Sequence, residues 1–104
     1  MELIKEVVPK VSRVALLRHP TNPASATYTR GAEAAARSLG VRLQTLDART
    51  PQEIDSAFAA MTRERAGALM IFPDAFFGTQ RRQIAELAAK TRLPAIHGER
   101  RSTR

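Results

Sequence analysis

The 104-residue chain contains no cysteine and no tryptophan, and it has a single tyrosine. The lack of cysteine excludes disulfides and thiolate metal sites, although it fits either redox compartment. No stretch approaches the ~20 consecutive apolar residues that a membrane-spanning helix needs. The first residues, 1–6, lack a basic segment followed by an apolar one. We therefore expect no signal peptide, and a cytoplasmic location if the chain is expressed as written.

Several catalytic and nucleotide-binding motifs are missing as well. No glycine-rich phosphate loop follows the first apolar run, and no G-x-S-x-G sequence is present. Arg18 and His19 occupy the place where a phosphoacceptor receiver domain needs an acidic pair. No two histidines are spaced as ligands on one helix. We therefore expect no enzymatic activity, no catalytic residues, no cofactor and no metal.

The basic charge is large but dispersed. The formal net charge is +7, and the sequence has 17 lysines and arginines against 10 acidic residues. Adjacent basic pairs occur at residues 81–82 and 100–101, and no aromatic residues alternate with them for base stacking. This pattern favours a solvated basic surface. A basic domain with incidental nucleic-acid affinity stays open as an alternative.

The composition is that of one soluble globular domain, with 43% hydrophobic and 26% charged residues. A chain of this length buries about 65% of its unfolded surface. Residues 1–98 are predicted to form a single α/β lobe, and residues 99–104 a basic C-terminal tail.

Apolar runs and helical periodicities alternate along the chain. Residues 3–8 have helical spacing and end at Pro9, and residues 14–17 form an apolar run typical of a buried strand. Residues 41–46 alternate like a half-exposed edge strand, and residues 68–72 form the most apolar strand, which we expect to be central. Residues 94–97 are predicted to form a fourth, short strand. Helices are predicted between these strands, with the following inner faces: Tyr28, Ala32, Ala35 and Leu39; Ile54, Phe58 and Met61; Ile84, Leu87, Ala88 and Thr91.

Residues with defined conformational preferences mark the helix ends. We expect a helix from about Ala24 to Gly40, where the glycine is the C-terminal signal. Thr50 is predicted to cap the next helix, with Pro51 in its first turn and Glu53 completing a capping box. Thr79 is predicted to cap the helix after the third strand.

This alternation predicts a three-layer α/β/α sandwich with a parallel sheet. Right-handed crossovers and a single switch point give the strand order 2-1-3-4, with helices on both faces. Two loops, residues 19–24 and 73–78, then lie at the carboxyl edge of the sheet, where α/β folds bind ligands.

The side chains of these loops suit a small, amino-acid-like ligand. Asn22 supplies an amide, and the helix N-termini offer N–H groups to a carboxylate. Tyr28 adds a hydroxyl or an aromatic wall. Phe76 and Phe77 are adjacent and cannot both point into the core, so one of them is predicted to line the mouth of an apolar site.

Asp74 belongs to this predicted ligand site, and it is also part of a possible metal or acid–base site. With His19 and His97, it stands at the ends of neighbouring strands, where two imidazoles and a carboxylate can bind a metal or perform acid–base chemistry. The alternative is that each is a loop residue that caps a helix or meets solvent, because Pro-Asp after a strand commonly begins a turn. We favour the second interpretation.

The chain resembles the ABC-transporter substrate-binding proteins of the type I periplasmic fold. The likeness extends from Glu2 to about Gly98 and rests on the order and spacing of several segments. These are residues 3–17, the Asn22-Pro23 loop, residues 32–37, residues 39–41, residues 73–77, residues 81–88 and residues 93–96. Members usually carry asparagine at the position of His19 and an aromatic residue at that of His97.

The resemblance implies a Rossmann-like second lobe whose Asn22 and Asp74 loops face an interlobe cleft. In such proteins two lobes close over a ligand, often an amino acid, and present it to a membrane permease in the periplasm. A single lobe implies weak or absent ligand binding. It also leaves the fourth strand with an unpaired edge, so a homodimer is expected. A cytoplasmic self-associating interaction or regulatory module is the alternative.

Overall fold

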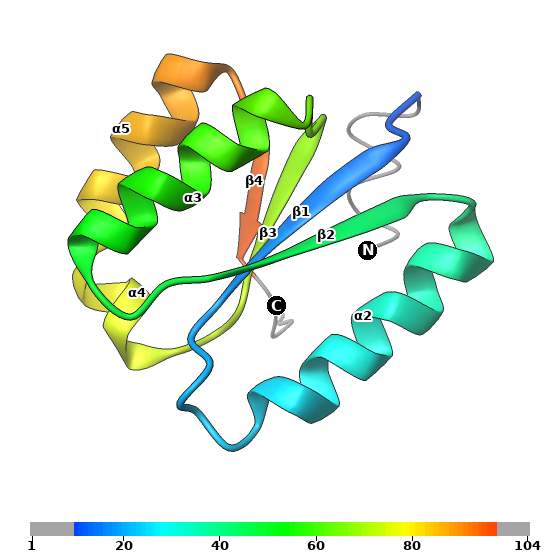
Figure 1. Ribbon diagram of the computed structural model, residues 1–104, viewed down its shortest axis with the longest axis horizontal. Helices are drawn as coiled ribbons and strands as arrows, with labels where there is room; N and C mark the ends of the chain where they lie inside the picture. The colour runs from blue at the N-terminus through cyan, green and yellow to red at the C-terminus, as the bar shows by residue number, and fades with distance from the viewer. Residues whose placement is uncertain (1–9, 98–104) are drawn as a thin grey trace, which may run out of the picture.

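The computed structural model describes residues 10–97, which form a four-stranded parallel sheet with the order β2-β1-β3-β4 (Figure 1). The strands are β1 (Arg13–Arg18), β2 (Arg42–Asp47), β3 (Ala68–Ile71) and β4 (Ala95–His97). The predicted parallel sheet and its strand order are confirmed. The predicted helix over residues 3–8 and the predicted tail over residues 99–104 lie outside the described residues.

The two central strands are apolar because both of their faces are covered. Along β1, Ala15 and Leu17 point into one hydrophobic cluster, and Val14 and Leu16 point into another. All four are fully buried. β3 divides in the same way, and its four residues are all buried. This explains why these strands show continuous apolar runs, whereas the edge strand β2 is half-exposed along most of its length.

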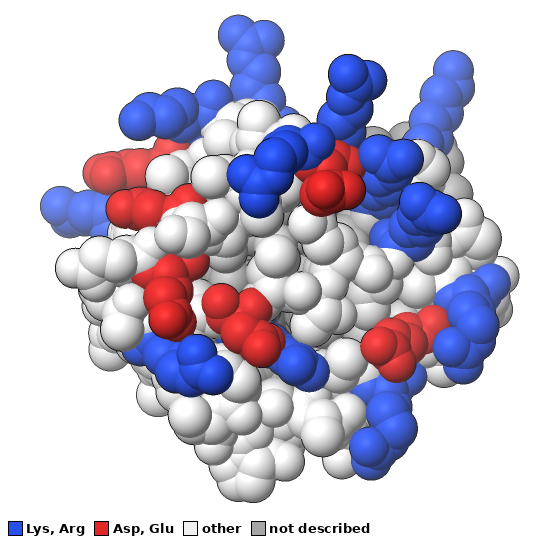
Figure 2. Space-filling view, viewed as in Figure 1, with Lys and Arg blue, Asp and Glu red and all other residues white. Residues whose placement is uncertain are grey.

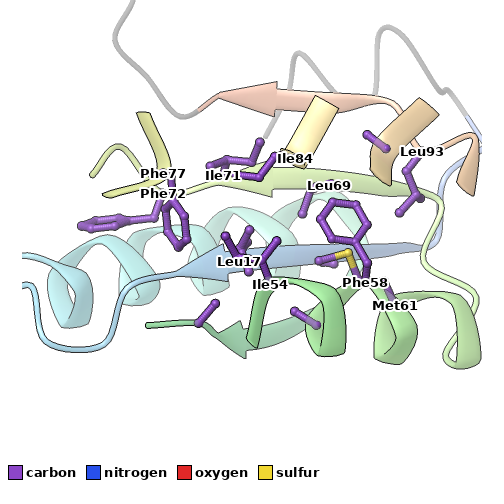
Figure 3. Packing of buried hydrophobic residues seen from close by; sticks show 14 residues of the cluster. Leu17, Ile54, Phe58, Met61, Leu69, Ile71, Phe72, Phe77, Ile84 and Leu93 are labelled. Carbon is purple, nitrogen blue, oxygen red and sulfur yellow. The ribbon is translucent and has the colours of Figure 1, made fainter. Parts of the chain in front are cut away.

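The helices cover the sheet in two layers. The helix α2 (Ser25–Leu39) contributes to the cluster on one face. The helices α3 (Pro51–Arg63), α4 (Ala75–Thr79) and α5 (Arg81–Thr91) contribute to the larger cluster on the other face (Figure 1). Figure 3 shows the centre of this larger cluster, where Phe58 and Met61 of α3 lie against Leu69 of β3. The described residues therefore form three layers.

The residues at the start of α3 act largely as predicted. The Thr50 hydroxyl accepts a hydrogen bond from the Glu53 N–H at 3.1 Å, and Pro51 occupies the first turn. The Glu53 carboxylate accepts from the N–H of Arg49 at 2.7 Å, one residue before the cap. The two reciprocal bonds fix the point at which the chain enters the helix.

Left-handed residues end the other two long helices. Gly40 follows α2 with φ 70°, as predicted, and its N–H bonds the carbonyls of Ala36 and Arg37. Arg92 follows α5 with φ 59°, a conformation that costs a residue with a Cβ more than it costs glycine.

Two local predictions were wrong. Thr79 does not cap α5; it ends α4, and its hydroxyl donates to the carbonyl of Phe76 at 2.7 Å. The N-cap of α5 is Gln80, whose side chain makes no capping bond. The segment 73–78 was expected to be a loop, but most of it forms α4, because the Asp74 carboxylate accepts from the Phe76 N–H and starts a short helix.

The buried face of α2 differs in part from the predicted one. Its buried residues are Ser25, Thr29, Ala32 and Ala36, while Tyr28, Ala35 and Leu39 are half-buried. These four small side chains allow the helix axis to lie close to the sheet. The larger side chains of Tyr28 and Leu39 then lie at the side of the interface between α2 and the sheet.

Candidate ligand-binding site

The two predicted loops meet at the carboxyl edge of the sheet and are bonded to each other. The Asn22 Nδ2 donates to Asp74 Oδ1 at 2.5 Å, although 52 positions separate the two residues. The side-chain oxygen of Asn22 accepts from the Ala24 N–H at 2.9 Å, and Asp74 Oδ2 accepts from the Phe76 N–H at 2.9 Å. The amide and the carboxylate therefore fix both loops and the start of α4.

An aromatic cluster lies beside this contact. The His19 ring centroid is 5.2 Å from that of Phe76 and 6.1 Å from that of Phe77, and the two phenylalanine rings are 5.3 Å apart. Phe77 is 2% exposed and belongs to the core, whereas Phe76 and His19 are half-buried. The expectation that the two phenylalanines do not both enter the core fits this geometry. Phe76 is the one that reaches the surface.

Tyr28 lies apart from this cluster. Its ring packs edge-on against Phe72 with centroids 5.1 Å apart. It also lines a hollow of about 280 Å³ together with Thr27, Gly31, Ala32, Ala35 and Met70. None of the other four predicted ligand residues lines this hollow. The structure therefore brings Asn22, Asp74, Phe76 and Phe77 together and places Tyr28 on the flank of α2.

The two helix N-termini at this edge differ. The Asp74 carboxylate already caps α4. At α2 the N-cap residue is Ala24, and no side chain caps the helix. The positive end of the α2 dipole therefore faces the carboxyl edge, where the Asn22 side-chain oxygen accepts from the N–H of Ala24.

His19 is held by its neighbour in the turn. Its Nδ1 lies 2.8 Å from the hydroxyl of Thr21, and its carbonyl accepts from the Asn22 N–H at 3.1 Å. Across residues 10–97, no three histidine, cysteine or acidic side chains are grouped to hold a metal ion. The side chain of His97 is not among those described.

An ion pair at the same edge was not predicted. Arg18 Nε lies 2.6 Å from Asp47 Oδ1, and Arg18 Nη1 donates to the hydroxyl of Thr29 at 2.9 Å. Arg18 and Asp47 end β1 and β2 and are partners in the register. The signal in the sequence is that two adjacent parallel strands end in opposite charges.

The described residues thus form an α/β lobe whose carboxyl edge carries both polar and aromatic side chains. Residues 1–103 match the family model of the ABC transporter substrate binding protein. The chain belongs to this family. Its members bind substrates for transport and are not enzymes.

Solved structures confirm the fold of the lobe. An ABC domain in complex with L-Trp from Streptococcus pneumonia superposes with a TM-score of 0.84 at 21% identity, over 94% of this chain and 33% of that one. A conserved domain protein from Vibrio cholerae superposes with a TM-score of 0.83 at 19% identity, over 94% of this chain and 33% of that one. The ligand-free, open structure of a substrate binding protein with adhesive properties from Clostridium difficile superposes with a TM-score of 0.84. The sequence identity is 16%, over 95% of this chain and 33% of that one.

The chain spans about a third of the length of each of these solved structures. A search of curated protein sequences gives no match. Among the described residues, no helix is long and apolar enough to cross a membrane.

Proposed function

We propose that this chain supplies one lobe of a solute-binding protein and that the carboxyl edge forms half of a site for an amino-acid-like ligand. The observation that carries the proposal is the hydrogen bond between Asn22 and Asp74. This bond joins the two loops beside the half-buried ring of Phe76, so that polar and apolar groups lie at one surface.

The chemistry of this edge favours a ligand with a carboxylate and an apolar side chain. The start of α2 suits a carboxylate, since helix N–H groups and the helix dipole both attract anions. The Phe76 ring suits an apolar or aromatic group, with the buried Phe77 supporting it from beneath. The L-Trp bound to the streptococcal relative is consistent with this class. Tyr28 lines a separate hollow on the flank of α2, and its contact with the ligand stays a prediction.

A single lobe covers one side of its ligand. Binding sites for small molecules normally bury most of the ligand surface, and this lobe tested by itself supplies about half of that enclosure. We therefore expect millimolar affinity or none for the chain alone. In its family setting the lobe works outside the cytoplasm and presents its ligand to an ABC permease.

A thermal-shift screen against amino acids and small carboxylates tests the site. A ligand that binds only the folded chain raises the melting temperature, and above its Kd the shift grows with the logarithm of ligand concentration. Selective stabilisation at millimolar concentration, lost in Phe76→Ala and kept in Leu87→Ala, is the expected result. Leu87 is a matched control because it is also half-buried against the same cluster.

Calorimetry on the same samples completes the test. Micromolar affinity for any amino acid would contradict the proposal that one lobe binds weakly. Equal loss of stabilisation in both variants would place the ligand away from Phe76.

We also infer that the chain forms a homodimer through β4. This strand ends the described sheet, and it is short, with an exposed Ala95 and a half-buried Ile96. An edge strand with unpaired backbone groups is a template for pairing with a second copy. The other edge strand, β2, begins and ends with exposed charged residues that oppose such pairing.

A further inference from the structure

The basic side chains of the described residues concentrate at the amino edge of the sheet, opposite the candidate ligand site. Six exposed basic residues lie where β1 and β2 begin or where α3 and α5 end: Lys10, Arg13, Arg42, Arg63, Arg65 and Arg92. Among residues 10–97, Glu64 is the acidic residue at these positions. In Figure 2 most of the lysine and arginine side chains gather over the upper part of the molecule, where β1 and β3 begin in Figure 1. This edge therefore carries a positive potential.

Arg13 and Arg42 occupy neighbouring positions at this edge. They are the first residues of β1 and β2 and are partners in the parallel register. Since partners in a parallel pair point to the same face, both side chains lie on the face that α3 covers. They line a hollow of about 370 Å³ together with Leu43, Gln44 and Glu64.

One guanidinium in this hollow is already oriented. Arg13 Nη1 donates to the carbonyl oxygen of Glu64 at 2.9 Å. This bond uses one of five N–H donors and satisfies a carbonyl at the C-terminus of α3, where the helix dipole would otherwise repel an anion. In the described part of the chain, neither Arg13 nor Arg42 has a carboxylate within 4.0 Å. Two like charges therefore lie side by side, and within residues 10–97 neither of them forms an ion pair.

We propose that the hollow lined by Arg13, Arg42 and Gln44 binds a phosphate group, either as free phosphate or as part of a small phosphorylated molecule. Guanidinium groups match the oxygen spacing of phosphate and form paired, charge-assisted hydrogen bonds with it. A dianion neutralises both arginines at once, and the Gln44 amide supplies a neutral donor. The Glu64 carboxylate lines the same hollow and opposes the bound anion.

This site is independent of the proposed amino-acid site. The hollow lies at the amino ends of β1 and β2, whereas Asn22 and Asp74 follow the carboxyl ends of β1 and β3. A phosphate group and an amino acid can therefore occupy the chain together.

Titration with inorganic phosphate and with glycerol 3-phosphate tests the proposal at pH 8 and constant ionic strength, where both probes are dianions. Backbone amide shifts followed by NMR should change saturably at residues 13, 42–44 and 64. Arg42→Gln should weaken binding at least tenfold, Gln44→Ala should weaken it severalfold, and Glu64→Gln should tighten it.

Arg81→Gln is the matched control because it removes the same charge from an exposed position at the start of α5, at the other edge of the sheet. Binding in this variant should stay within twofold. Saturation by either probe with the expected loss in Arg42→Gln supports the site, and the preferred probe identifies free phosphate or a phosphorylated molecule. Equal weakening by Arg42→Gln and Arg81→Gln would overturn it in favour of nonspecific charge attraction. Absence of saturable shifts would also overturn it.

Discussion

At the scale of single residues, Asn22 and Asp74 have a structural task in addition to the ligand contact proposed for them. Each uses its side-chain oxygens to hold backbone N–H groups, and the amide of one bonds the carboxylate of the other. The sequence predicted that both residues lie at the same edge, because each follows an apolar strand. It could not predict their mutual bond, since that depends on loop conformations set by tertiary packing.

Asp74→Ala should lower the free energy of unfolding by about 1–2 kcal/mol, because α4 loses its N-cap and the Asn22 amide loses its acceptor. Urea unfolding followed by circular dichroism measures this difference. Glu33→Ala provides the control, since Glu33 is exposed on α2, away from any cap, and its carboxylate has no hydrogen bond or ion pair among the described residues. Its effect should stay within about 0.5 kcal/mol. Equal effects of the two substitutions would show that the Asp74 contacts contribute nothing specific.

At the scale of helices and strands, boundaries were predictable where one residue has one dominant conformational preference. Gly40 ends α2 and Thr50 caps α3 for the reasons that the sequence suggests. The helix α4 was missed because Pro73-Asp74 marks a turn as readily as a helix start. A five-residue helix also has no periodicity to reveal it.

Arg92→Gly should raise the free energy of unfolding by about 1 kcal/mol. Arg92 has φ 59°, and glycine adopts this left-handed conformation without the Cβ penalty. The matched control is Lys90→Gly inside the last turn of α5, which should destabilise the chain by about 1 kcal/mol. Thermal melts of the three proteins provide the comparison. Destabilisation by Arg92→Gly would mean that the arginine side chain contributes more than its backbone strain costs.

At the scale of the whole molecule, the sheet was the most predictable feature. Continuous apolar runs at residues 14–17 and 68–72 identify two buried strands, and right-handed crossovers then leave few possible orders. The pairing of Arg18 with Asp47 escaped prediction because it requires the register as well as the order. The segregation of positive charge at the amino edge was hidden for the same reason. Basic residues dispersed in the sequence come together when strand starts and helix ends share one side of the sheet.

Self-association is also a property of the whole molecule. Light scattering at high protein concentration should give the mass of a dimer, and Ala95→Lys should give a monomer, because lysine on an edge strand opposes pairing. Ala34→Lys places the same charge on an exposed position of α2 and should leave the dimer intact. A monomeric mass for the unmodified chain would exclude the proposed interface.

The central position of β1 has a consequence for synthesis of the chain. β1 is translated before β2 and β3, yet it pairs with both of them. During translation its apolar residues therefore leave the ribosome long before either neighbouring strand exists. Residues 14–17 lack their second neighbouring strand until β3 emerges about fifty positions later. Because transiently exposed apolar segments are prone to aggregate, we expect chaperones that shield hydrophobic segments to bind the nascent chain at this stage.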